Sequence, residues 1–146
     1  MHPFPHRYVI QARSGSEGPV TLSSAESPDI ASNSPPEFDG PPGFWSPETL
    51  LCSAVGDCFV LSFRAVARAS RLAWSNLSVQ VEGTLERVDG VTRFTRFTTH
   101  AVLEVPQGTD VDKARSLLDK AEHICLISNS LNGESILNAE VRVLSA

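Results

Sequence analysis

The residues of this chain that could do redox or nucleophilic chemistry are its three cysteines, Cys52, Cys58 and Cys125. An odd number of cysteines does not suit a framework of structural disulfides, so they are buried thiols, metal ligands or reactive thiols. Cys52 and Cys58 are separated by six positions, which on a helix turns their side chains about 120° apart. We therefore predict that these two do not form a pair and that Cys52 is a packing residue.

Cys58 and Cys125 have different neighbours in the sequence. Cys58 lies in an apolar stretch, where a cysteine often serves as a small hydrophobic side chain. Asp57 beside it disfavours a thiolate, and Arg64 would favour one only if it faced the sulfur. Cys125 has one potential metal ligand nearby, His123, which is too few for a metal site. We expect neither a metal nor a cofactor.

Glu48 is a further candidate for a role in chemistry. On a continuous helix it lies about 80° around and about 15 Å along the axis from Cys58, so it cannot act on that sulfur within one helix. A carboxylate in the first helical turn also has a structural explanation, because it interacts favourably with the helix dipole. A catalytic role for Glu48 would require another chain or a returning loop.

The first third of the chain is predicted to be rich in turns and short strands. Nine of the ten prolines lie within residues 1–47, and proline removes a backbone donor and fixes φ. Short strands are predicted over 6–12, 20–22 and 29–31. Residues 34–43, with their prolines and glycines, are predicted to form a loop.

A long helix is predicted to follow this loop. Ser46, Pro47 and Glu48 supply an N-cap, a proline at the first helical position and a carboxylate in the first turn. Apolar residues then recur at helical spacing over six to seven turns, so we expect the buried central helix of the domain. Its expected core residues are Leu50, Leu51, Ala54, Val55, Cys58, Phe59, Leu61, Ser62, Ala65, Val66 and Ala69.

The rest of the chain alternates between strand and helix patterns. Residues 76–89 and 91–105 read as a β-hairpin with its turn at Asp89-Gly90. Thr109-Asp110 is predicted to cap an amphipathic helix carrying Val111, Ala114, Leu117, Leu118 and Ala121 on one face. A short helical turn over 125–131 and a strand over 136–144 complete the order strands, long helix, hairpin, helices, strand. We predict an α+β fold.

Composition, charge and hydropathy argue against several classes of protein. The chain has 146 residues, 41% of them apolar, and a net charge of −5 with only two lysines. We expect a single globular domain over 1–146 that does not bind nucleic acid. The most apolar stretch, 47–73, contains Asp57, Arg64 and Arg68, so no membrane span is expected. The N-terminus has no long apolar region typical of a signal peptide, so a cytoplasmic location is expected.

Two motifs resemble those of the OsmC/Ohr family, the osmotically inducible protein C and organic hydroperoxide resistance proteins. The first is SPPEFDGPPGFWSPETLL at 34–51 followed by AVGDCF at 54–59, in which a Pro-Glu-x-Leu helix start precedes a cysteine in a small, apolar helix. The second is HICLISNSL at 123–131, a cysteine followed by a helix with Ser and Leu. The order of elements is similar to that of the family from about residue 5 to 145.

The resemblance implies an OsmC-like fold in an intertwined homodimer, with sheets wrapped on central helices and active sites at the interface. It also implies a thiol-dependent peroxidase for organic hydroperoxides. Cys58 would be the peroxidatic cysteine and become a sulfenic acid. Cys125 would resolve it as a disulfide, which a dithiol reduces. Glu48 would belong to the network that orients the activating group.

The chain departs from the family pattern at one position. The hydroperoxide-resistance branch has an arginine just before the Glu of the loop motif, where this chain has Pro36 before Glu37. Arg7 or Arg13 on the first strands could replace the missing cation that stabilises the thiolate. The alternative is a non-catalytic OsmC-like dimer that binds a small apolar ligand or a partner in its interface cleft. A thiol hydrolase is disfavoured because no histidine is placed beside Cys58.

Overall fold

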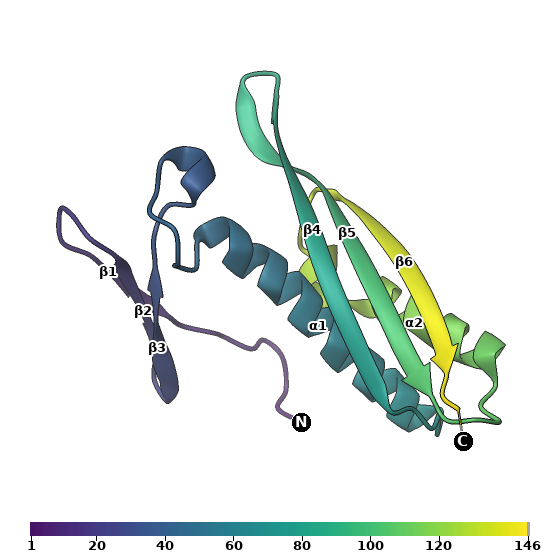
Figure 1. The fold of residues 1–146 in the computed structure, drawn as a ribbon. Coiled ribbons are helices and arrows are strands. Elements are labelled where there is room, and N and C mark those ends of the chain that lie inside the picture. The colour runs from purple at the N-terminus through teal and green to yellow at the C-terminus, as the bar shows by residue number, and fades with distance from the viewer. Residues whose placement is uncertain (146) are drawn as a thin grey trace. The chain divides into compact units, whose positions relative to one another are not determined.

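The structure, a computed structural model, describes residues 1–145. It divides into two compact units, Met1–Leu50 and the chain from Leu51 onward. The elements follow the predicted order of strands, long helix, hairpin, helices and strand (Figure 1). The predicted α+β class is confirmed, and each unit contains one three-stranded sheet.

The first unit is built on an antiparallel sheet in the order β1-β2-β3. Its strands are β1 (Gln11–Arg13), β2 (Val20–Ser24) and β3 (Ser27–Ser32). The predicted first strand over 6–12 is largely wrong, because only the three residues of β1 pair with β2. The predicted strands over 20–22 and 29–31 are confirmed and are longer than expected. The loop that follows contains one 3-10 turn, η1 (Pro36–Phe38).

The long helix α1 (Pro47–Ala69) begins where the sequence predicts. The Ser46 hydroxyl accepts from the Thr49 backbone N–H, and the Thr49 hydroxyl accepts in turn from the Ser46 N–H, which is a reciprocal N-cap. The expected burial is only partly correct. The core side of the helix is formed by Val55, Phe59, Phe63, Val66 and Ala67, whereas Leu61, Ala65 and Ala69 are exposed. Periodicity shows which positions are apolar but not which of them the chain itself covers.

The second unit has a sheet in the order β4-β5-β6. The antiparallel pair β4 (Asn76–Val88) and β5 (Val91–Val105) confirms the predicted hairpin. Asp89 and Gly90 both have positive φ, as the two-residue turn requires. The last strand, β6 (Glu134–Val143), lies parallel to β5 and begins two residues earlier than expected.

Two further helices complete this unit, α2 (Val111–Ile124) and α3 (Leu126–Asn129). The Asp110 side chain accepts from the Lys113 N–H, which confirms the predicted cap of α2. The core joins one face of α1 and one face of α2 to the inner residues of β5. Its buried members are Phe59, Phe63, Val66, Ala67, Ala101, Leu103, Val105, Ala114, Leu117, Leu118 and Ala121.

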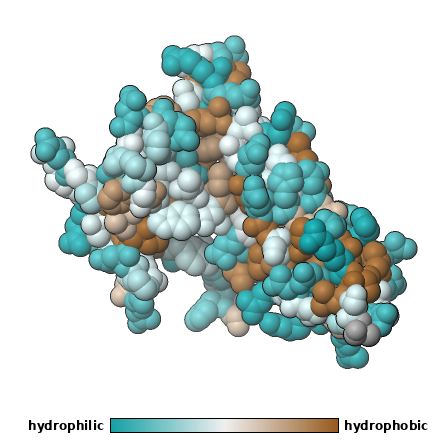
Figure 2. All heavy atoms as spheres, in the orientation of Figure 1, coloured by the Kyte–Doolittle hydropathy of each residue, from teal (hydrophilic) through white to brown (hydrophobic). Residues whose placement is uncertain are grey.

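Apolar surface is exposed on both units, as the brown regions of Figure 2 show. In the first unit the exposed residues include Phe4, Tyr8, Val9, Ile10 and Trp45. Helix α1 is long and apolar enough to cross a membrane by those two measures alone. Core helices of water-soluble proteins meet the same measures, and here one side of α1 is packed into the core of its unit.

Candidate thiol site

Cys58 lies in the middle of α1, in the turn that also carries the buried Phe59. Its thiol is only partly buried, and the Ser62 hydroxyl one helical turn further on lies 4.0 Å from its sulfur. Asp57, the preceding residue, is exposed to solvent. Cys58 therefore lies at the edge of the face of α1 that packs into the core of the second unit.

Cys125 occupies the junction between α2 and α3. Its backbone is extended, with φ −62° and ψ 105°, so that it is at once the C-cap of α2 and the N-cap of α3. The Cys125 N–H donates to the Glu122 carbonyl, and the Cys125 carbonyl accepts from the Asn129 N–H. The side chain is 0% exposed. The change of helix direction thus holds a thiol inside the protein.

Cys58 and Cys125 are both free thiols of the second unit, and Cys58 lies near enough to affect the pKa of the Cys125 thiol. Burial is the main cause that raises the pKa of the Cys125 thiol above its ordinary value. The neighbouring Cys58 raises the pKa of Cys125 further. The surroundings of Cys125 therefore favour its neutral thiol.

Ser128 is the other polar neighbour of the buried sulfur. Ser128 lowers the pKa of the Cys125 thiol, although burial outweighs its effect. The Ser128 side chain is 8% exposed, and its Oγ has no well-aligned hydrogen bond within the described residues. The hydroxyl is therefore placed beside a sulfur that, as a neutral thiol, is a poor acceptor.

Glu48 belongs to the first unit and lies in the first turn of α1. One carboxylate oxygen, Oε2, is fully buried and has no hydrogen-bond partner among residues 1–145. Glu48 lines a cavity of about 440 Å³ within the first unit, together with Val20, Ser32, Asn33, Ser34, Pro35, Phe38 and Pro47. The catalytic role suggested for Glu48 stays a prediction.

Cys52 packs as the sequence predicts. A Cβ atom built on Gly83 of β4 would lie 2.6 Å from the Cys52 sulfur and 2.9 Å from the Phe94 ring, so the sulfur sits directly against the strand backbone. Burial raises the pKa of the Cys52 thiol, although a hydrogen bond from the Gly83 backbone lowers it. A sulfur so enclosed contributes packing rather than reactivity.

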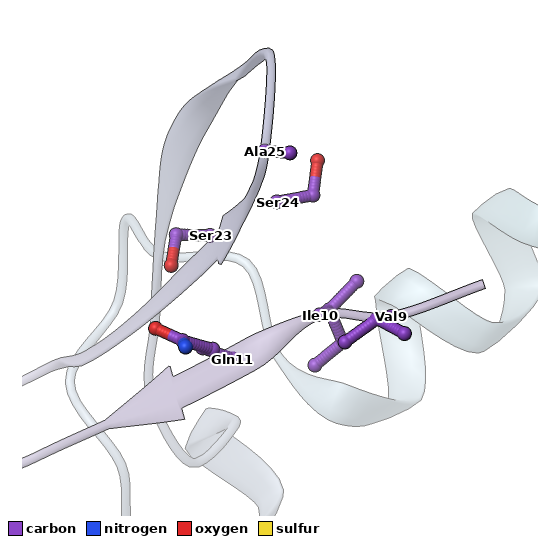
Figure 3. A pocket seen from close by; sticks show the side chains of 6 residues that line it. All are labelled: Val9, Ile10, Gln11, Ser23, Ser24 and Ala25. Carbon is purple, nitrogen blue, oxygen red and sulfur yellow. The ribbon is translucent and has the colours of Figure 1, made fainter.

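The remaining clusters do not compete with the thiol pair. Within residues 1–145, no three His, Cys, Asp or Glu side chains are grouped to hold a metal ion. A second cavity of the first unit, of about 290 Å³, lies beside β1 and the β2–β3 turn (Figure 3). Val9, Ile10, Gln11, Ser23, Ser24 and Ala25 line it, and none of these carries a titratable or thiol group.

Two residues near the thiols were missed in the sequence as functional candidates, Ser62 and Ser128. Both could have been found from spacing alone. Ser62 is four residues after Cys58, on the same face of a helix. Ser128 is three residues after Cys125, the position whose N–H an N-cap side chain contacts.

Comparison with known proteins places these features in a wider group. Residues 40–140 match the family described as OsmC-like protein. An uncharacterized protein of Bacillus subtilis, YmaD, is 29% identical over 117 residues, which are 75% of each chain. The fold is similar to that of an organic hydroperoxide resistance protein OsmC from Legionella pneumophila, with TM-score 0.75, 23% identity, and coverage of 97% of this chain and 100% of the other. An OsmC-like protein from Mycoplasma pneumoniae aligns with TM-score 0.79, 18% identity and the same coverage.

Proposed function

The chain belongs to the family of OsmC-like proteins, and on this premise we propose that it is a thiol-dependent peroxidase for organic hydroperoxides. The observation that carries the proposal is that a partly exposed thiol, Cys58, lies near enough to the buried Cys125 to affect its pKa. One thiol is partly exposed and can meet a substrate, whereas its partner is buried beside it. This is the arrangement that a peroxidatic and a resolving cysteine require, because oxidation of one thiol must be followed by attack from the other.

In the proposed cycle the Cys58 thiolate attacks the distal oxygen of the hydroperoxide. The O–O bond breaks, Cys58 becomes a sulfenic acid, and the alkoxide takes a proton and leaves as an alcohol. The Cys125 thiol loses its proton and attacks the Cys58 sulfur, and the sulfenic hydroxyl leaves as water. A dithiol then reduces the disulfide and is itself oxidised to a disulfide. Each turnover consumes one hydroperoxide and one dithiol.

We propose a homodimer as the active form and one OsmC-like domain over 1–146 as its unit. Apolar side chains that their own unit leaves exposed support the homodimer: Leu61 in the second unit, and Tyr8, Ile10 and Trp45 in the first. A second copy would also offer Glu48 a route to a thiol that it cannot reach along its own helix. Sedimentation equilibrium tests this directly, and a monomer at micromolar concentration would contradict it.

A reducing cytoplasmic location is the compartment that suits this cycle. All three cysteines are free thiols in the structure, and free thiols persist where glutathione and thioredoxin systems keep them reduced. The dithiol reductant that the cycle needs would be supplied by the same environment.

Steady-state turnover of cumene hydroperoxide with a dithiol tests the proposal. We expect turnover to fall to the uncatalysed rate in Cys58→Ser. In Cys125→Ala we expect the first oxidation to persist while turnover is lost. Cys52→Ser is the matched control and should keep the wild-type rate, because its sulfur faces Gly83. Unchanged turnover in Cys58→Ser would overturn the mechanism. Absence of turnover in the wild type, with Pro36 in place of the loop arginine, would favour the non-catalytic binding alternative.

A further inference from the structure

The two sulfurs of the thiol pair differ in access and in hydrogen bonding. Cys58 is partly exposed and has one polar neighbour, the Ser62 hydroxyl at 4.0 Å. Cys125 is 0% exposed, and the buried Ser128 hydroxyl, three residues further on, has no hydrogen-bond partner among the described residues. Once the two sulfurs are joined in a disulfide, an incoming thiolate can attack only one of them.

Access decides which sulfur is attacked. Attack requires that the nucleophile reach the sulfur in line with the S–S bond, which the burial of Cys125 opposes. The sulfur that is not attacked leaves as a thiolate, and a better stabilised thiolate leaves faster. Burial opposes a thiolate on Cys125, and a hydrogen bond donated by the buried Ser128 hydroxyl would offset part of that cost.

The Ser128 hydroxyl fits this role better than a structural one. Its Oγ is fully buried and makes no well-aligned hydrogen bond within the described part of the chain. A buried hydroxyl without a good acceptor costs stability. A thiolate on Cys125 is the acceptor that would satisfy it, because charged acceptors form markedly stronger hydrogen bonds than a neutral thiol does. The Ser128 hydroxyl is thus placed to stabilise the Cys125 thiolate that forms when the Cys58–Cys125 disulfide is cleaved.

We propose that the dithiol reductant attacks the Cys58 sulfur and expels Cys125 as a thiolate held by Ser128, which makes Ser128 a positioning residue for the reduction step. This inference rests on the proposed function. The reductant thiolate forms a mixed disulfide with Cys58, the Cys58–Cys125 bond breaks, and Cys125 then takes a proton. The second thiol of the reductant loses its proton and attacks the first reductant sulfur. This closes an oxidised cyclic dithiol and releases the Cys58 thiolate.

Mapping the mixed disulfide tests the direction of attack. The wild-type disulfide is treated briefly with cysteamine, a monothiol that cannot complete the second step. The reaction is quenched with acid, free thiols are alkylated, and both cysteine peptides are identified by mass spectrometry. We expect cysteamine on Cys58 and the alkyl group on Cys125. Cysteamine on Cys125 would overturn the inference while leaving the peroxidase cycle intact.

The same experiment separates the inference from the proposed function. If a hydroperoxide forms no Cys58–Cys125 disulfide, the peroxidase cycle fails. The disulfide can then be made with diamide, and the mapping still decides which sulfur is attacked. Cysteamine on Cys58 supports the direction of attack whichever oxidant made the disulfide.

Ser128→Ala tests the positioning role, with Ser130→Ala, at the C-cap of the same short helix, as the matched control. Ser130 is exposed and its hydroxyl donates to the Leu126 carbonyl rather than to a sulfur. We expect Ser128→Ala to slow disulfide cleavage by cysteamine roughly 2- to 10-fold, the effect of losing one hydrogen bond, and Ser130→Ala to leave it unchanged. An unchanged rate in Ser128→Ala would contradict the role.

A second readout excludes a merely structural effect of the substitution. In a variant that keeps Cys125 as its only cysteine, the thiolate absorbance near 240 nm reports its ionisation. We expect Ser128→Ala to raise the pKa of Cys125, because the hydroxyl lowers it in the wild type. Slower cleavage without any rise in the pKa would show that Ser128 acts only through the fold.

Discussion

The two units of the chain differ in how much of their structure they can support alone. Every buried apolar side chain of residues 1–145 lies in the second unit, from Val55 onward. The buried residues of the first unit are two serines, Ser32 and Ser46, while most of its large apolar side chains are exposed. Burial of apolar area is the dominant favourable contribution to folding. The second unit therefore has an apolar core of its own, and the first unit does not.

The candidate site residues are also divided between the two units. Cys58 and Cys125 both belong to the second unit and are positioned by its core. Glu48 and the loop containing Pro36 belong to the first. A substitution in the second unit should therefore affect stability and the thiol pair directly. A substitution in the first unit should affect them only through the contacts that this unit makes with other surfaces.

The largest difference is expected between two phenylalanines. Phe63 is 0% exposed in the core, and its ring packs edge-on against the Trp74 ring with the two ring centroids 5.4 Å apart. Phe44 of the first unit is 43% exposed. We expect Phe63→Ala to lower the free energy of unfolding by about 3–5 kcal/mol and Phe44→Ala by less than about 1 kcal/mol. Urea unfolding at one fixed protein concentration measures both. Equal losses would remove the distinction between the units.

Glycines provide a sharper test of packing. Alanine at Gly83 would place its Cβ 2.6 Å from the Cys52 sulfur, whereas the nearest atom to a Cβ at Gly15 of the first unit is 3.8 Å away. Overpacking of this kind costs about 1–3 kcal/mol, so we expect Gly83→Ala to destabilise and Gly15→Ala to have little effect. Adding Cys52→Ala should recover part of the loss in thermal unfolding. No recovery would mean that the Phe94 ring, not the sulfur, limits the space.

Local signals in the sequence were sufficient for most elements of the second unit. Asp89-Gly90 specified a hairpin turn because few residue pairs adopt positive φ at both positions. Asp110 specified the start of α2 through its side-chain cap. Such signals act over three or four residues, so one sequence is enough to read them.

Features that depend on contacts between residues distant in the sequence could not be predicted from local signals. The first strand was predicted over 6–12, but pairing with β2 begins only at Gln11. Leu61 and Ala65 were predicted to be buried because apolar spacing does not reveal which covering surface is present. The nearness of Cys58 to Cys125 depends on how α1 and α2 pack on β5, which no local pattern contains. The resemblance to a family was the signal that suggested the pair.

Helix caps give the next comparison. Ser46 in the first unit is 2% exposed and exchanges two hydrogen bonds with Thr49, whereas Asp110 caps α2 with one exposed hydrogen bond. Loss of a cap costs about 0.5–2 kcal/mol. We expect Ser46→Ala to lie at the upper end of this range and Asp110→Ala at the lower end, as measured by urea unfolding. The reverse order would show that the buried cap is not the stronger one.

The smallest expected effect depends on pH and belongs to the second unit alone. Glu122 lies in the last turn of α2, and its Oε2 is buried without a partner among the described residues. Burial raises the pKa of this carboxyl above its ordinary value of 4.5, so the folded state prefers the neutral form. Stability from this group is therefore complete below pH 4.5 and is lost as the pH rises through the raised pKa.

Glu122→Gln should accordingly stabilise the protein near neutral pH and leave it unchanged at acid pH. Because the side chain is only half-buried, solvent screening limits the gain to less than about 1 kcal/mol. Thermal unfolding between pH 3.5 and 7.5 measures the difference between variant and wild type, which should grow with pH. Asp119→Asn removes the same charge from an exposed position of the same helix and is the matched control. An equal, pH-dependent gain in that control would show that net charge, not burial of one carboxylate in the second unit, causes the effect.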